Sequence, residues 1–158
     1  MSQEKAKAHL EKYGYAERIR TFPVSSATVA LAAVALGTEE ARIAKTLSFL
    51  TSGGAILIVT AGDAKIDNRK YKDTFGEKAK MIPFAEVEGL IGHAVGGVCP
   101  FGVNEGVKVY LDCSLRRFDT VFPAAGESNN AVELTIPELE LSSECVGWLD
   151  VTRTEEIA

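Results

Sequence analysis

A glycine-rich stretch over residues 92–102 is the part of this chain best suited to chemistry. Its sequence, GHAVGGVCPFG, places four glycines and one proline in eleven residues, just before an apolar segment over 107–111. Glycine and proline disfavour a helix interior by about 1 and 3 kcal/mol relative to alanine, so the stretch is predicted to be a loop. Because glycine carries no side chain, a ligand can approach the backbone N–H groups of such a loop closely.

Lys45 is the second chemically informative residue. It is a single cation between Ile43-Ala44 and the apolar run Thr46–Leu50. A lysine at the entrance of a strand, with its ammonium in water, is the ordinary interpretation. Together with the loop it suggests more, because backbone N–H groups and an ammonium can hold a carboxylate or a developing oxyanion. The pair suits ester hydrolysis or anion binding, and spacing alone leaves both open.

Two side chains inside the loop could take part in catalysis. Cys99 is expected to be a small buried apolar residue rather than a nucleophile, whereas His93 could act as a general base or bind the loop backbone. The chain lacks the usual phosphate-loop, dinucleotide, nucleophile-elbow and zinc-protease motifs. Three widely spaced cysteines and two histidines indicate no disulfide framework, and neither a metal nor another cofactor is expected.

Length, composition and net charge limit the classes of protein to which the chain can belong. The 158 residues are predicted to form one domain over 1–158, with 46% hydrophobic and 25% charged residues. No apolar run approaches the roughly 20 residues that span a bilayer, and no secretory signal is visible, so a cytoplasmic protein without a membrane partner is expected. The net charge of −5 argues against general adhesion to nucleic acid. Residues 63–80 differ, with six positive and four negative charges, which fits either a solvated face or phosphate contacts.

Hydrophobic periodicity and turn residues indicate the elements that must position this chemistry. Ser25 or Ser26 is expected to cap the second helix, and Gly92 to end the helix before the loop. Strands joined by short turns and mixed with helices predict an α+β fold with a mixed sheet or a barrel-like core. Strands are predicted over 18–22, 46–50, 55–60, 107–111 and 131–136, and helices over 2–13, 27–36, from 38, 67–75, 83–91 and 137–144, with an irregular segment over 115–121 and a turn over 123–130.

Between about residues 20 and 150 the chain resembles the YbaK/EbsC family of aminoacyl-tRNA deacylases, which are relatives of the editing insertion of bacterial prolyl-tRNA synthetases. The matching pieces are Ile43-Ala44-Lys45-Thr46-Leu47, the pattern Gly92-x-x-Val95-Gly96-Gly97-Val98-x-Pro100-x-Gly102, Asp112 after the next strand, and Gly126 before Val132-Glu133-Leu134.

The resemblance implies an α+β editing-domain fold around a mixed β-barrel-like sheet. It also implies hydrolysis of the ester that joins a wrong amino acid to the 3′ end of a tRNA, typically tRNA(Pro) carrying Cys, Ala or another small amino acid. No protein nucleophile, metal or cofactor is implied. Lys45, Gly96 and Gly97 correspond to the catalytic positions. The implied substrate-binding residues are Phe22, Thr46, His93, Val98, Pro100, Phe101, Gly102, Ser128, Asn129 and Asn130.

The implied partners are the 3′ end of an aminoacyl-tRNA and prolyl-tRNA synthetase as a docking partner. A protein that grips only the CCA end needs few phosphate contacts, which lysines over 65–80 with Arg116 and Arg117 could supply. Phe22 and Ala124 stand where relatives that favour cysteinyl substrates tend to have hydroxyl side chains, so the amino acid removed stays open. The alternative function is a non-catalytic module that binds tRNA ends, nucleotides or a synthetase.

Overall fold

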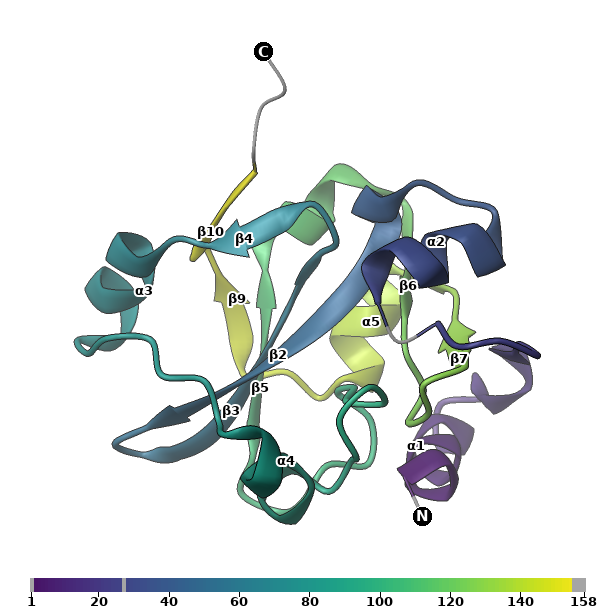
Figure 1. Cartoon of the computed structure of the whole chain (residues 1–158), viewed down its shortest axis with the longest axis horizontal. Helices are drawn as coiled ribbons and strands as arrows, with labels where there is room; N and C mark the ends of the chain where they lie inside the picture. Colours follow the sequence, from purple (N-terminus) through teal and green to yellow (C-terminus); the bar gives the residue numbers. More distant parts are fainter. Residues whose placement is uncertain (1, 27, 155–158) are drawn as a thin grey trace.

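A mixed, curved six-stranded sheet forms the centre of the computed structural model, which describes residues 2–26 and 28–154 (Figure 1). Its strands run in the order β8-β6-β2-β3-β5-β9. The long hairpin of β2 and β3 is antiparallel, while β6 pairs with β2 and β5 pairs with β3 in parallel. These strands are β2 (Ile43–Thr51), β3 (Gly54–Ala61), β5 (Lys108–Asp112), β6 (Thr120–Pro123), β8 (Leu134–Thr135) and β9 (Gly147–Leu149).

Two short strand pairs flank this sheet. The first joins β1 (Ile19–Thr21) to β7 (Asn130–Val132), and the second joins β4 (Ala64–Ile66) to β10 (Thr152–Thr154). The expected strand over 131–136 is therefore two strands, because β7 and β8 pair with different partners. Together with the helices, these strands confirm the α+β fold with a mixed sheet.

In the part of the chain that the structure describes, five α-helices surround the sheet: α1 (Ser2–Glu11), α2 (Val29–Leu36), α3 (Asn68–Phe75), α4 (Phe84–Ile91) and α5 (Ile136–Ser142). Asp67 caps α3 by accepting from two backbone N–H groups, and Gly92 ends α4 with a φ of 100°. The predicted cap of α2 is wrong, since Thr28 rather than Ser25 or Ser26 accepts from Leu31 N–H. The residues after 38 form only a 3₁₀ turn, Glu40–Arg42. Two further 3₁₀ turns are Ala16–Arg18 and Cys113–Arg117.

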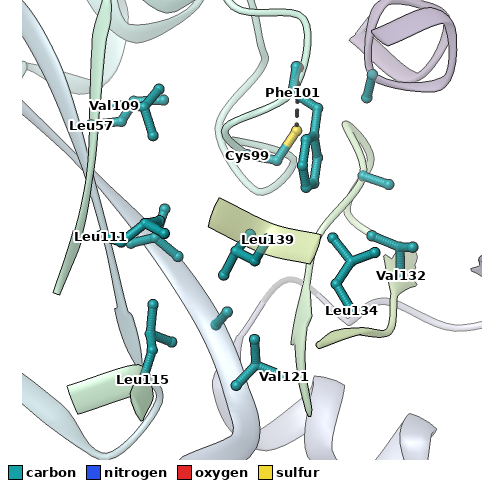
Figure 2. Packing of buried hydrophobic residues seen from close by; sticks show 14 of the residues in the cluster. Leu57, Cys99, Phe101, Val109, Leu111, Leu115, Val121, Val132, Leu134 and Leu139 are labelled. Atoms are coloured by element: carbon teal, nitrogen blue, oxygen red, sulfur yellow. Dashed lines mark hydrogen bonds between the residues drawn. The ribbon is translucent and has the colours of Figure 1, made fainter. Parts of the chain in front are cut away.

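The largest apolar cluster lies between the sheet and helices α1, α4 and α5. Leu57 and Leu111 contribute from the sheet, Leu10 from α1 and Leu139 from α5. Figure 2 shows part of this cluster, including two residues of the glycine-rich loop. The loop is therefore anchored in the core at one end. In the described ranges, no helix combines the length and the apolar character needed to cross a membrane.

Candidate active site

The site is built on an interruption in the pairing of β2. On the side away from β3, β2 pairs with β6 through Ile43 and Ala44. Further along, Ser48 O accepts from Ile82 N (3.2 Å) and Leu50 N donates to Lys80 O (2.8 Å). Backbone groups of successive strand residues point alternately to the two sides. Thr46, two residues before Ser48, therefore directs its N–H and C=O into the gap between these two partners.

A cleft of about 480 Å³ occupies this gap. Its walls come from β2, α2, the start of α4, the glycine-rich loop and the turn after β6. Lys45 and Thr46 both line it although their side chains leave opposite faces of the strand, so the cleft extends around the open edge of β2. Among the described residues, Lys45 is the one charged side chain in the lining, and most of the others are apolar.

The ammonium of Lys45 lies in a partly buried and electrostatically mixed setting. Burial lowers its pKa from the ordinary value of 10.5, the charge of Asp63 raises it and that of Lys65 lowers it further. Asp63 is held by Arg117, whose Nη1 and Nη2 donate to the two carboxylate oxygens at 2.9 and 2.5 Å. Because Arg117 already engages this carboxylate, Asp63 supports Lys45 at a distance without occupying its ammonium.

Thr46 adds a second polar group to the cleft. Its Oγ1 is buried and has no hydrogen-bond partner among the described residues. A hydroxyl removed from water without a partner costs free energy, about 1–3 kcal/mol in proteins. Thr46 therefore contributes an unpartnered hydroxyl as well as backbone groups that face the gap.

The glycine-rich loop contributes backbone to the opposite wall. Gly96 and Val98 both line the cleft, and Gly96 has a φ of 95°. Gly97 lies behind them, and a Cβ there would lie 2.5 Å from the carbonyl oxygen of Gly126, so only glycine lets the two backbones meet. The N–H of Gly97 donates to Ala94 O (3.0 Å), which closes the turn that presents Gly96.

Four other loop residues, among them three predicted binding residues, are buried in the core. Cys99 and Phe101 are fully buried, and Figure 2 shows the Cys99 thiol directed at the backbone of Phe101. Burial raises the pKa of this thiol to about 12, which agrees with the packing role expected of Cys99. His93 is also fully buried, and its Nε2 donates to Phe101 O (2.5 Å). Burial lowers the pKa of His93 below its ordinary value of 6.5, so the ring is neutral at pH 7. Pro100 is buried as well.

The other predicted binding residues hold the turn that forms the third wall. Asn130 lines the cleft, but its side-chain amide accepts from Ala125 N (3.0 Å) and donates to Ala125 O (3.0 Å). Asn129 donates to Phe22 O (3.0 Å), and Ser128 O accepts from the N–H of Ser26 (2.6 Å). These bonds attach the segment before α2 to the turn after β6, whereas the Phe22 ring and Ser128 lie outside the cleft lining.

Sequence reasoning missed the apolar part of the cleft. Residues from α2, β6 and the segment around α4 face the same space as Lys45, and their only signal in the sequence was an unusually apolar helix over 29–36. Asp112, Cys113 and Asp150 bring metal-ligating atoms together, but none of the three lines the cleft. The apolar lining residues that were missed include Val29, Ala32, Ile82, Phe84, Val87 and Phe122.

Comparison with known proteins identifies the family. A sequence profile of the aminoacyl-tRNA editing domain matches residues 24–141. The chain belongs to the aminoacyl-tRNA editing domain family. It is 48% identical over 157 residues to the uncharacterised protein YwhH of Bacillus subtilis strain 168, covering 99% of this chain and all of that protein. A proline–tRNA ligase of Leuconostoc citreum strain KM20 is 26% identical over 122 residues, which are 74% of this chain and 21% of the ligase.

Solved structures of similar proteins share this editing-domain fold. A protein described as a candidate trans-editing enzyme for prolyl-tRNA synthetase superposes with a TM-score of 0.86 at 29% identity, over 98% of both chains. The hypothetical protein APE2540 superposes with a TM-score of 0.80 at 27% identity, over 92% of this chain and 99% of that one. The cleft on β2 is therefore set in a fold that these full-length neighbours share.

Proposed function

We propose that this chain hydrolyses the ester of misacylated tRNA, with tRNA(Pro) carrying Cys, Ala or another small amino acid as the substrate. The observation that carries the proposal is that Lys45, the one charged side chain among the described cleft residues, shares the cleft with the backbone of Gly96 in a member of the editing-domain family. The proline–tRNA ligase relative and the trans-editing neighbour support tRNA(Pro) as the carrier.

The proposed reaction needs no covalent intermediate. An aminoacyl ester is already activated, so orientation and charge stabilisation can supply much of the acceleration. Water attacks the ester carbonyl carbon, the bond to the ribose oxygen breaks, and the proton of the water passes to that oxygen by way of the neighbouring ribose hydroxyl. The products are the free amino acid and the deacylated tRNA. Lys45 stabilises negative charge on the substrate, while Gly96 and the N–H of Thr46 orient the carbonyl group.

The cleft lining supports a small, uncharged amino acid. Its walls are largely apolar, with Ala124 and Phe122 lining the side of β6. Apolar pockets discriminate one methylene by only about 1–3 kcal/mol, so neighbouring small amino acids are expected to be cleaved at related rates. The Thr46 hydroxyl is the side-chain group placed to distinguish a polar substituent from an alkyl one.

A deacylation panel tests the proposal directly. The purified chain is incubated with Cys-, Ala- and Ser-tRNA(Pro) and with correctly charged Pro-tRNA(Pro), and release of the amino acid is followed. We expect cleavage of at least one mischarged tRNA and a loss of at least about 100-fold for Lys45→Ala. Lys72→Ala, which changes an exposed lysine of α3, is the matched control. Binding without turnover would instead support a non-catalytic tRNA-binding module.

We further propose that the protein acts in the cytoplasm and meets its substrate beside prolyl-tRNA synthetase. The match covers about a fifth of the proline–tRNA ligase that the chain resembles, which supports a substrate shared with that class of enzyme. A pull-down of the synthetase with the full chain, in the presence and absence of tRNA(Pro), tests whether docking requires the tRNA.

A further inference from the structure

One rim of the cleft exposes large apolar side chains to solvent. Met81, Phe84 and Val95 all line the cleft, yet 58%, 78% and 46% of their surfaces are exposed. Met81 is held beside β2 by a bridge to Phe49, and Phe84 is the first residue of α4. In Figure 1, α4 lies at the bottom of the view and follows the segment that bonds to β2, and the glycine-rich loop leaves its end. We call these three residues the Phe84 rim.

Positive charge precedes this rim in the sequence. Lys78 and Lys80 are exposed in the segment that leads to Met81, and the backbone of Lys80 is fixed by the bond from Leu50 N (2.8 Å). Proteins that bind single-stranded nucleic acid combine an aromatic surface for the bases with cations for the phosphates. The segment from Lys78 to Phe84 carries both kinds of group, with Phe84 in the cleft lining and the exposed lysines a few residues before it in the chain.

We propose that the Phe84 rim is the stacking platform for the terminal adenine of the substrate, with Lys80 close to the phosphate on its 5′ side. This inference rests on the proposed function, because an aminoacyl group inside the cleft leaves its adenosine at the mouth. A protein partner could also cover an apolar rim. A protein seated there would, however, obstruct the cleft that the aminoacyl end must enter, so the rim is assigned to the base.

The variant test compares two exposed apolar residues. Phe84→Ala is expected to raise the KM for the aminoacyl-tRNA by about ten-fold with a smaller change in kcat, since stacking holds the substrate without touching the ester. Phe84→Trp, which preserves a flat aromatic face, is expected to restore KM. Val34→Ala is the control, because Val34 is 82% exposed on α2 and lies outside the cleft lining. An unchanged KM for Phe84→Ala overturns the proposal.

A substrate series separates this inference from the proposed function. The wild-type chain is given the same amino acid as an ester of tRNA, of adenosine and of ethanol. We expect KM to be lower for the adenosine ester than for the ethyl ester, and Phe84→Ala to remove most of that difference. If the wild type cleaves the tRNA ester and Phe84→Ala retains the preference for adenosine, the platform is wrong and the hydrolase stands. If the wild type cleaves none of the esters, the proposed function itself fails.

Discussion

At the scale of single residues, the consecutive strand residues Lys45 and Thr46 both line the cleft, although their side chains leave opposite faces of β2. Consecutive strand residues normally serve opposite faces of a sheet. Here β6 pairs with β2 only as far as Ala44, so the strand edge at Thr46 is open and both faces border the same space. The interrupted pairing, rather than either side chain alone, is what makes the site.

The lowered pKa of Lys45 gives a prediction for the pH profile. Burial shifts the loss of its proton to lower pH than in an ordinary lysine, so a step that requires the ammonium slows as pH rises through this lowered pKa. We expect kcat/KM for deacylation, corrected for spontaneous hydrolysis, to fall on the alkaline side for the wild type. The guanidinium of Lys45→Arg stays charged over this alkaline range, so the activity that this variant retains should not show the same fall. If Lys45→Arg retains some activity and shows the same alkaline fall, another group is responsible.

For Cys99, in contrast to Lys45, we predict that substitution leaves catalysis nearly unchanged. Its thiol is fully buried with a pKa of about 12, so it does not form a thiolate near neutral pH. We expect Cys99→Ala to keep kcat within about two-fold of the wild type while lowering the unfolding free energy by about 1 kcal/mol through a small cavity. Deacylation kinetics and urea unfolding measure the two effects. A loss of about 100-fold in kcat with the fold intact would make Cys99 catalytic after all.

At the scale of elements, helix α1 braces the glycine-rich loop from behind, although it lies outside the matched editing-domain segment 24–141. The N–H of Gly102 donates to His9 Nδ1 (3.0 Å), and His9 Nε2 donates to Ser142 O (2.6 Å) at the end of α5. A Cβ on Gly102 would lie 2.5 Å from Lys5 O, so the loop and the helix are in direct backbone contact. One imidazole thus joins the loop to two helices.

Removing this imidazole is expected to affect turnover as well as stability. His9→Leu leaves the N–H of Gly102 without its acceptor, which costs about 1–3 kcal/mol of unfolding free energy. Because the same loop presents Gly96, we expect kcat to fall several-fold with little change in KM. His9→Asn, which can still accept from Gly102, is expected to recover part of kcat. The control is Lys12→Ala, which removes an exposed ion pair to Glu144 and the contact of the ammonium with the Tyr13 ring. Equal kcat in all variants would make the brace purely stabilising.

A second element-scale prediction concerns the start of α5. Glu138 completes a capping box with Thr135 and accepts from Arg18 Nη1 (2.8 Å), and the bond to Arg18 is the main reason that its pKa falls to about 2. A carboxylate with a depressed pKa stabilises the fold above its ordinary pKa of 4.5, and this stabilisation is lost as pH falls towards about 2. We expect Glu138→Gln to cost about 1 kcal/mol at pH 7, because the pair is partly solvated. Urea unfolding should show the difference shrinking below about pH 4.5.

Much of the fold could be predicted from local signals, because single residues often determine where a helix is capped and where the chain turns. Asp67 and Gly76 bound α3, Gly92 ends α4, and the hairpin through Gly54 was expected. The short strands β6 and β9 were missed because strands of three or four residues are defined by distant partners.

For the site, too, the sequence indicated which residues take part, but it could not indicate side-chain orientations that depend on distant packing. The sequence placed Lys45, Thr46 and Gly96 in one site by resemblance, and all three line the cleft. It could not show that His93 turns into the core, because that depends on how Phe101 packs. Nor could it show that the amide of Asn130 is occupied by the backbone of Ala125.

At the scale of the whole molecule, the charged segment over residues 63–80 is only partly committed to the fold. Lys70 donates to Asp150 (3.1 Å) and to Thr152 O (2.9 Å), Asp67 caps α3, and Glu77 accepts from Ser52. Arg69 and Lys72 are exposed on α3, which contributes nothing to the cleft lining, so only part of the local positive charge lies on the segment that leads to the cleft. With a net charge of −5, the protein as a whole repels a tRNA at long range.

The salt dependence of deacylation follows from this charge distribution. A protein that holds only the single-stranded end of a tRNA displaces few counterions, and each phosphate contact on a single strand contributes a slope of about −0.7 to a plot of log affinity against log salt. With Lys80 and Lys78 as the outer contacts, we expect a slope of kcat/KM between about −1 and −2. The double variant Lys78→Ala/Lys80→Ala should flatten it by about 1, whereas Lys72→Ala should not. A slope steeper than about −4 would require a wide basic surface that the described residues do not form.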